Sequence, residues 1–120
     1  MGVDFSVQQR NGYTVVRVEG DPSLEEFLGF VEVLAEQSRG WQDERALCDL
    51  RSVRTLKSFT EHYAVGQAVA RHLRHLRQVA SVVPADRITH TSEKTAQSAG
   101  VNLRVFTSEG EAIKWLTTPE

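Results

Sequence analysis

Short apolar runs alternate with stretches of helical periodicity along this chain, and the alternation limits it to an α/β fold. The apolar runs cover residues 46–50, 79–83 and 103–106. Such continuous runs are typical of strands that are covered on both faces. The helical stretches cover about 21–40, 60–76, 92–99 and the segment from 108 onward. Strands that alternate with helices lie parallel and are joined by right-handed crossovers.

The first twenty residues predict an antiparallel hairpin ahead of the parallel strands. We expect its strands near 3–10 and 13–20, because apolar and polar residues alternate there. Between them, Asn11-Gly12 would supply the two positive φ angles of a tight hairpin turn. The expected fold is a mixed sheet with about four helices, in the order β-β-α-β-α-β-α-β-α.

Capping residues mark where several of these helices should begin. Asp21 would cap the first helix, with Pro22 in its first helical position, and Gly40 would end it. Phe30 lies off the main apolar stripe of that helix, which predicts a second apolar contact. The last helix would begin at a capping box, Ser108-Glu109-Gly110-Glu111.

Length and composition exclude several classes of protein. A chain of 120 residues predicts a single domain, 1–120, large enough to fold without a disulfide or a metal. Its net charge of −2 argues against a generic nucleic-acid binder. No apolar stretch approaches the roughly 20 residues of a membrane span. The polar N-terminus lacks a signal peptide, so we expect a cytoplasmic protein. Met1-Gly2 with Ser6 fits a myristoylation pattern, but we interpret it as the lead-in to the first strand.

No group of residues predicts catalysis, a metal site or a cofactor. His72 and His75 are one helical turn apart, but no third ligand accompanies them. Cys48 lies inside an apolar run and is interpreted as a small core residue. Asp49 follows it and is expected to accept backbone N–H groups from the next loop. The chain has no Ser/His/Asp arrangement and no glycine-rich phosphate loop, so we expect a protein that is not an enzyme.

The junction after the third strand is the strongest candidate for a functional site, because ligands of α/β sheets collect where strands end and helices begin. Ser58 and Glu61 have the spacing of a capping box. One interpretation is a plain helix cap. The other is a phosphate held at the helix N-terminus, with Arg54 and Lys57 nearby.

An aromatic residue at this junction also has two interpretations. Phe59, with Leu56 and Tyr63 nearby, would either form an apolar patch that anchors a partner or pack back on its own helix. The candidate partner-binding residues are Arg54, Lys57, Ser58, Phe59, Thr60 and Tyr63. Residues 51–77 hold six basic residues and one acid, which favours either a docking stripe for an anionic partner or a solvated helix face.

Two segments resemble the STAS domain of anti-sigma-factor antagonists, and more closely its SpoIIAA-like, stand-alone bacterial relatives. The first is Leu47-Cys48-Asp49-Leu50-x-x-Val53-x-x-Leu56-Lys57-Ser58-Phe59-Thr60. The second is Val105-Phe106-x-x-x-x-x-Ala112-x-x-Trp115-Leu116. The resemblance covers nearly the whole chain. It implies a cytoplasmic, non-enzymatic regulatory domain that binds a protein partner or a second copy of itself.

The family's Asp-Ser-Ser/Thr-Gly signature, whose second hydroxyl is phosphorylated, falls on residues 57–60. Only Ser58 matches, because Lys57, Phe59 and Thr60 occupy the other three positions. Ser58 and Thr60 remain candidates for phosphorylation in a shifted version of the switch.

A second function stays open beside the regulatory one. The resemblance to STAS and Sec14-like folds also implies a small carrier of a lipid or another apolar ligand. Phe27, Phe30, Phe59 and Tyr63 would then line its cavity.

Overall fold

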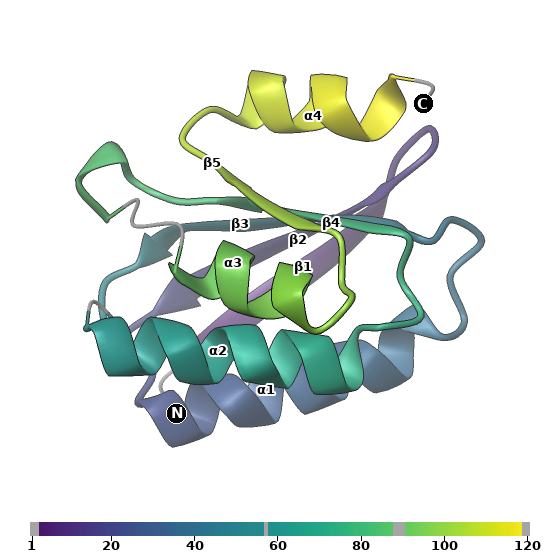
Figure 1. Ribbon diagram of the computed structural model, residues 1–120. Coiled ribbons are helices and arrows are strands. Elements are labelled where there is room, and N and C mark those ends of the chain that lie inside the picture. Colours follow the sequence, from purple (N-terminus) through teal and green to yellow (C-terminus); the bar gives the residue numbers. More distant parts are fainter. Residues whose placement is uncertain (1–2, 57, 88–90, 119–120) are drawn as a thin grey trace.

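The computed structural model describes residues 3–56, 58–87 and 91–118 and contains a five-stranded mixed sheet (Figure 1). The strands lie across the sheet in the order in which they occur along the chain. β1 and β2 are antiparallel, and every later pair is parallel. The strands are β1 (Val3–Gln9), β2 (Thr14–Gly20), β3 (Arg45–Val53), β4 (Gln78–Val82) and β5 (Leu103–Phe106). The predicted hairpin and the predicted parallel strands are confirmed.

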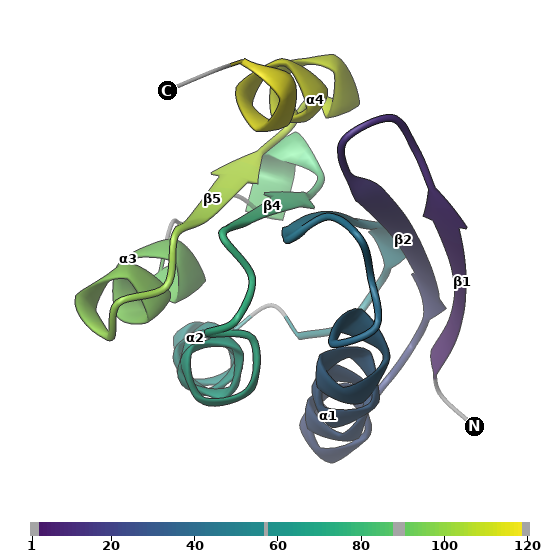
Figure 2. The same ribbon diagram turned by 90° about the vertical axis from the view of Figure 1, so that its right-hand side faces the viewer.

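Helices cover the two faces of the sheet unequally. One face is covered by α1 (Leu24–Ser38), α2 (Phe59–His72) and α3 (Thr91–Ser98), whereas α4 (Glu109–Thr117) lies alone on the other (Figure 2). A short 3₁₀ helix, η1 (Ala85–Arg87), follows β4. The element order β-β-α-β-α-β-α-β-α is the one that the sequence predicts.

The central strands are covered on both faces, as their continuous apolar runs predict. Along β3, Ala46 and Cys48 join the core under α1, α2 and α3, whereas Leu47 belongs to a second core under α4. Phe30 makes the expected second contact of α1, with its ring centroid 5.0 Å from that of Phe5 in β1.

One predicted helix cap differs from the structure, and a second is confirmed without its full capping box. Ser23, not Asp21, caps α1: its hydroxyl accepts the Glu26 N–H at 3.1 Å, and the Glu26 carboxylate accepts the Ser23 N–H at 2.9 Å. Pro22 therefore precedes the cap instead of occupying the first helical position. At α4, Ser108 accepts the Glu111 N–H, but the reciprocal bond is not among those found in the described part of the chain.

Three further details differ from the sequence prediction. The hairpin turn has a positive φ at Gly12 (95°) but not at Asn11. β3 extends to Val53, beyond the predicted end at residue 50. α2 ends at His72 and not near 76, yet Leu73 and Leu76 remain buried in the turn that follows.

Candidate functional site

The β3–α2 junction is tied to the loop that follows β2. The Arg54 N–H donates to the Gly20 carbonyl at 3.1 Å, and its guanidinium donates to both carboxylate oxygens of Asp21, at 2.7 and 3.0 Å. The Thr55 hydroxyl donates to the Pro22 carbonyl. Asp21 therefore anchors the junction instead of capping α1.

Leu56 gives the junction its sharp turn. Its φ is 67°, and it is the one non-glycine residue with positive φ in the ranges that the structure describes. The side chain is 8% exposed, and Nε2 of His62 donates to the Leu56 carbonyl at 2.7 Å. A leucine in this region is strained by roughly 1 kcal/mol or more. Burial of the side chain and the bond from His62 hold the turn in place.

Ser58 caps α2 in a complete capping box, so the sequence prediction of a cap is confirmed. Its hydroxyl accepts the Glu61 N–H at 3.3 Å, and the Glu61 carboxylate accepts the Ser58 N–H at 3.1 Å. The same carboxylate accepts the Ser58 hydroxyl at 2.8 Å, and Thr60 Oγ1 lies 3.3 Å from that hydroxyl. Lys57, the candidate between the turn and the cap, lies outside the described residues.

Phe59 and Tyr63 form an aromatic pair on the outside of the molecule. Phe59 is the first residue of α2 and is 69% exposed, and Tyr63 is 46% exposed. Their rings are stacked, with centroids 6.5 Å apart and an angle of 14° between the planes. Phe59 therefore does not bury itself against its own helix. Packing within the described fold does not explain so large an exposed aromatic surface.

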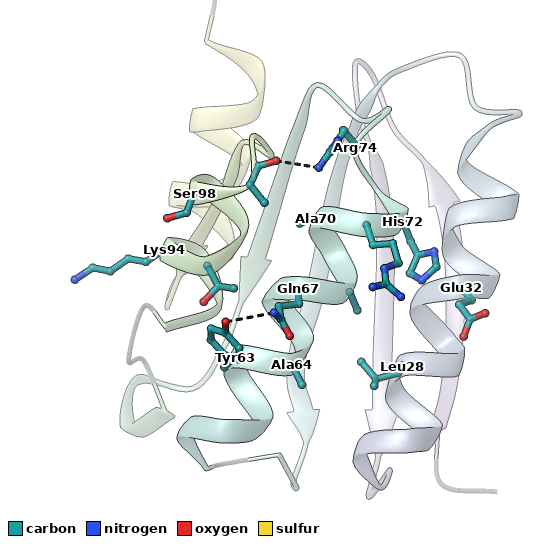
Figure 3. Close-up of a pocket in the computed structure, with 14 residues that line it drawn as sticks. Leu28, Glu32, Tyr63, Ala64, Gln67, Ala70, His72, Arg74, Lys94 and Ser98 are labelled. Carbon is teal, nitrogen blue, oxygen red and sulfur yellow. Dashed lines mark hydrogen bonds between the residues drawn. The ribbon is translucent and has the colours of Figure 1, made fainter.

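An open groove of about 1070 Å³ runs along α2 between α1 and α3, with Tyr63 at one end (Figure 3). Small side chains line much of it: Ala64, Ala68, Ala70 and Ala99. Its charged lining is mainly basic, with Arg71, Arg74 and Lys94 against Glu32. Among the described residues of the predicted partner surface, Tyr63 lines this groove, together with the basic residues Arg71 and Arg74.

A smaller apolar pocket of about 90 Å³ lies beneath the start of α2. Among the predicted ligand-lining residues, Phe27 lines this pocket, whereas Phe30 packs against Phe5 and Phe27 in the core. Phe59 and Tyr63 lie outside it. The structure therefore does not bring the four aromatic residues into one cavity, and the volume is below the roughly 300 Å³ of pockets that bind drug-sized ligands.

A network of four charged side chains fastens the start of α4 to the sheet. Arg17 of β2 lies 2.7 Å from the carboxylate of Asp49 and 2.9 Å from that of Glu109. Arg51 bridges the same two carboxylates at 2.8 Å each. Hydrogen bonds from Arg51 keep the pKa of Asp49 below its ordinary value, and those from Arg17 do the same for the pKa of Glu109. Asp49 also accepts the Arg51 N–H at 3.2 Å, from within β3 and not from the following loop as predicted.

The other reactive side chains of the described ranges lie apart from one another. Burial raises the pKa of the Cys48 thiol to about 12. His75 lies beyond the end of α2, where its Nε2 is 2.7 Å from the Ser38 hydroxyl, so it does not share a helix face with His72. In the part of the chain that the structure describes, no three His, Cys, Asp or Glu residues are grouped closely enough to hold a metal ion.

A protein-family model described as SpoIIAA-like matches residues 13–117 of the chain. The chain belongs to the SpoIIAA-like family. Two solved structures share the fold. An anti-sigma factor antagonist from Mycobacterium paratuberculosis has a TM-score of 0.65 and 13% identity, over 97% of this chain and 95% of that one. An uncharacterized protein with a SpoIIAA-like fold from Shewanella loihica PV-4 has a TM-score of 0.63 and 15% identity, over 96% and 93%.

Curated proteins give no match to this SpoIIAA-like chain. At 13–15% identity, the two structural relatives establish the fold and not the role of any residue. Across the described ranges, no helix combines the length and apolar character needed to cross a bilayer.

The charged network and the left-handed turn are the features that sequence reasoning missed. Arg17 and Glu109 are 92 residues apart, so no local pattern connects them. A signal for Arg17 was nevertheless present, because it is the one basic residue inside the apolar second strand. Leu56 carried no such signal, since leucine is among the residues least expected at positive φ.

Proposed function

We propose that this SpoIIAA-like protein is a non-enzymatic regulator that acts by binding a protein partner through the junction surface. That surface consists of Arg54, Lys57, Ser58, Phe59, Thr60 and Tyr63. The fold shared with an anti-sigma factor antagonist supports a regulatory role. We also expect the protein to act in the cytoplasm.

The exposed aromatic pair is the observation that carries this proposal. Phe59 and Tyr63 expose large apolar side chains beside one another at a helix start, whereas most large apolar residues in the described part are buried. Aromatic side chains of this kind act as anchors in protein interfaces. The basic groove that begins at Tyr63 would extend the contact along α2.

The chemistry of the described side chains supports a binding role over a catalytic one. Cys48, with its pKa of about 12, is protonated at neutral pH and shielded from solvent. Asp49 and Glu109 are neutralised by two arginines, so neither is positioned as a general acid or base. We therefore propose that the protein is not an enzyme.

Affinity purification from the native host, with wild-type and Phe59→Asp proteins as baits, tests the junction surface. We expect wild type to retain a protein partner that Phe59→Asp loses by at least tenfold, because a carboxylate in an apolar contact is strongly unfavourable. Asn102→Asp is the matched control: Asn102 is also exposed, but it precedes the edge strand β5, whereas the junction follows the central strand β3.

Recovery of every partner by Phe59→Asp, at an unchanged melting temperature, would contradict the proposal. Loss of the same partner in Asn102→Asp would also contradict it, since a general effect of charge would then explain the result.

The two hydroxyls of the junction differ in their suitability for phosphorylation. A phosphate on Ser58 would break the bonds of its hydroxyl within the capping box and lie against the Glu61 carboxylate. Thr60 lies in the first turn of α2, where a phosphate is favoured by the helix dipole. We propose Thr60 over Ser58 as the modified residue, and phosphopeptide mapping of protein from the native host would contradict this by finding phosphate on Ser58 alone.

The alternative function, a carrier of an apolar ligand, rests on the 90 Å³ pocket beneath α2. That volume suits a ligand far smaller than a lipid. Native mass spectrometry of the purified protein distinguishes the two functions, because a carrier would retain a small apolar ligand as an adduct and the regulator would not.

A further inference from the structure

The two edges of the sheet differ in whether another strand can pair with them. At the β5 edge, side chains of α3 form hydrogen bonds with the backbone of the strand. Glu93 accepts the Val105 N–H at 2.6 Å, and Gln97 donates to the Leu103 carbonyl at 2.8 Å. α3 lies directly beside this strand (Figure 2). The β5 edge is therefore closed to a further strand.

Among the described residues, none pairs with the outer side of β1. Figure 2 shows β1 at the far side of the sheet, with none of the described helices or strands beyond it. All seven of its residues pair with β2 without a bulge, from Val3 opposite Gly20 to Gln9 opposite Thr14. The strand, VDFSVQQ, contains no proline and no lysine, two devices by which proteins protect the edges of sheets. Its one charged side chain is Asp4.

The hairpin fixes which backbone groups face outward. The Arg10 N–H donates to the Tyr13 carbonyl at 2.8 Å, one residue pair beyond Gln9 and Thr14. Hydrogen-bonded and non-hydrogen-bonded pairs alternate in an antiparallel ladder. The even-numbered residues of β1 therefore bond to β2, and Val3, Phe5, Val7 and Gln9 direct their N–H and C=O groups to the open side.

Apolar side chains accompany this open edge. Val3, Phe5 and Val7 are only partly buried against the core. On α1, Phe30 contacts Phe5, and Val33, one turn further along, is 45% exposed. Since residues three apart share a helix face, Val33 lies on the β1 side of α1. The edge thus combines free backbone groups with apolar surface.

We propose that two copies of this chain pair antiparallel through β1, with Ser6 of each copy on the two-fold axis. The pairing joins the two sheets into one continuous sheet. Phe5 then lies opposite Val7 of the second copy, which continues the apolar face. On the other face, Asp4 lies opposite Gln8 of the second copy, whose amide can donate to the carboxylate. No like charges meet, and all seven residues of β1 are used.

This interface does not depend on the proposed partner surface. β1 lies at one edge of the sheet, and Phe59 and Tyr63 lie on α2, which packs against α1 and α3. A dimer through β1 leaves the junction surface free. Failure of one proposal would therefore leave the other unchanged.

Disulfide trapping tests both the interface and its register. Ser6 would lie opposite Ser6 of the second copy in a non-hydrogen-bonded pair. The two Cα atoms would be about 4.5 Å apart, which is within the range of a disulfide. Gln8 and its copy would be offset by four residues, about 13 Å along the strand. Both positions are exposed in the structure, so Gln8→Cys is the matched control for Ser6→Cys. The buried Cys48 does not compete for oxidation.

We expect Ser6→Cys to form a covalent dimer under mild oxidation at least tenfold faster than Gln8→Cys. We also expect sedimentation equilibrium to show a wild-type dimer that Val7→Pro converts to a monomer. The Val7 N–H faces the open side, so a proline there removes the intermolecular bond and keeps the ladder with β2. A monomeric wild type, equal crosslinking of both cysteine variants, or crosslinking of neither, would overturn the proposal whether or not Val7→Pro folds.

Discussion

Leu56 adopts a backbone conformation that is unfavourable for a residue with a side chain, and the surrounding contacts compensate for the strain. Its φ of 67° is tolerated because the side chain is buried and the carbonyl accepts a hydrogen bond from His62. The conformation turns the chain between β3 and α2, so it determines where the aromatic pair of the junction lies.

Substitutions of Leu56 can separate strain from packing. Leu56→Ala removes buried side-chain atoms and should lower the free energy of unfolding by about 2–4 kcal/mol. Leu56→Gly removes the same contacts but relieves the strain, so it should be more stable than Leu56→Ala by about 1 kcal/mol. Urea denaturation measures both values.

Leu47 is the control for this pair, because it is buried in a strand with ordinary φ. There the glycine variant should be the less stable of the two. The same order of stabilities at both positions would show that Leu56 is not strained.

Ser58 contributes to stability through the cap of α2. Ser58→Ala removes the acceptor for the Glu61 N–H and should lower the free energy of unfolding by about 1 kcal/mol. Ser58→Asn keeps an acceptor and should retain most of that stability. Thermal unfolding followed by circular dichroism measures the difference, and equal melting temperatures for Ser58→Ala and wild type would contradict the cap.

At the scale of the elements, the network of Arg17, Asp49, Arg51 and Glu109 joins three separate parts of the chain. It links β2, β3 and the first residue of α4 on the face where that helix lies alone. The apolar contacts of Leu116 and Ala112 hold the body of α4 on the sheet. The charged network fixes the end from which the helix starts.

This network makes stability depend on pH in a predictable direction. The pKa values of Asp49 and Glu109 are lowered in the folded state, so both carboxylates stabilise the protein above their unfolded pKa values, near 4. That stability is lost as the pH falls from about 5 through the lowered folded pKa values. Because both arginines are 42% exposed, solvent limits the total to about 1–2 kcal/mol.

The double variant Asp49→Asn/Glu109→Gln should therefore be less stable than wild type at pH 7 and nearly equal to it at low pH. Urea denaturation at a series of pH values measures the free energy of unfolding for both. Glu36→Gln, at an exposed position of α1, should follow wild type throughout. An equal loss of stability in the double variant at all pH values would contradict the electrostatic explanation.

At the scale of the whole molecule, β3 connects the two cores. Cys48 faces the core under three helices, and its neighbour Leu47 faces the core under α4. No solvent path to the thiol is expected while the fold is intact, since the side chain is buried and its pKa is raised to about 12.

The reactivity of Cys48 should therefore report global unfolding. At pH 8, a disulfide reagent should label native protein at least a hundredfold more slowly than a thiol in unfolded protein, because burial and the raised pKa both suppress the thiolate. The urea midpoint of labelling should coincide with that of circular dichroism. Fast labelling without urea would mean that the sheet opens locally near β3.

Local patterns in the sequence determined the elements and their order. Apolar periodicity located the strands and helices, and Ser58 with Glu61 predicted a capping box, because these interactions join residues at most four apart. Such patterns are short-range, so they do not depend on how the rest of the chain is arranged. Asp21 shows their limit, because the sequence predicted it as the cap of α1 and Ser23, two positions later, forms the cap instead.

Only the tertiary structure decided which residues face solvent and which distant residues meet. The order of strands, the exposure of Phe59, the pairing of Asp21 with Arg54 and the closure of the β5 edge by α3 all depend on contacts between segments far apart in sequence. The left-handed turn at Leu56 has the same origin. Its buried contacts outweigh the preference of a leucine backbone for negative φ. Composition and periodicity do not predict such contacts, because the contacts form only when the whole chain is packed.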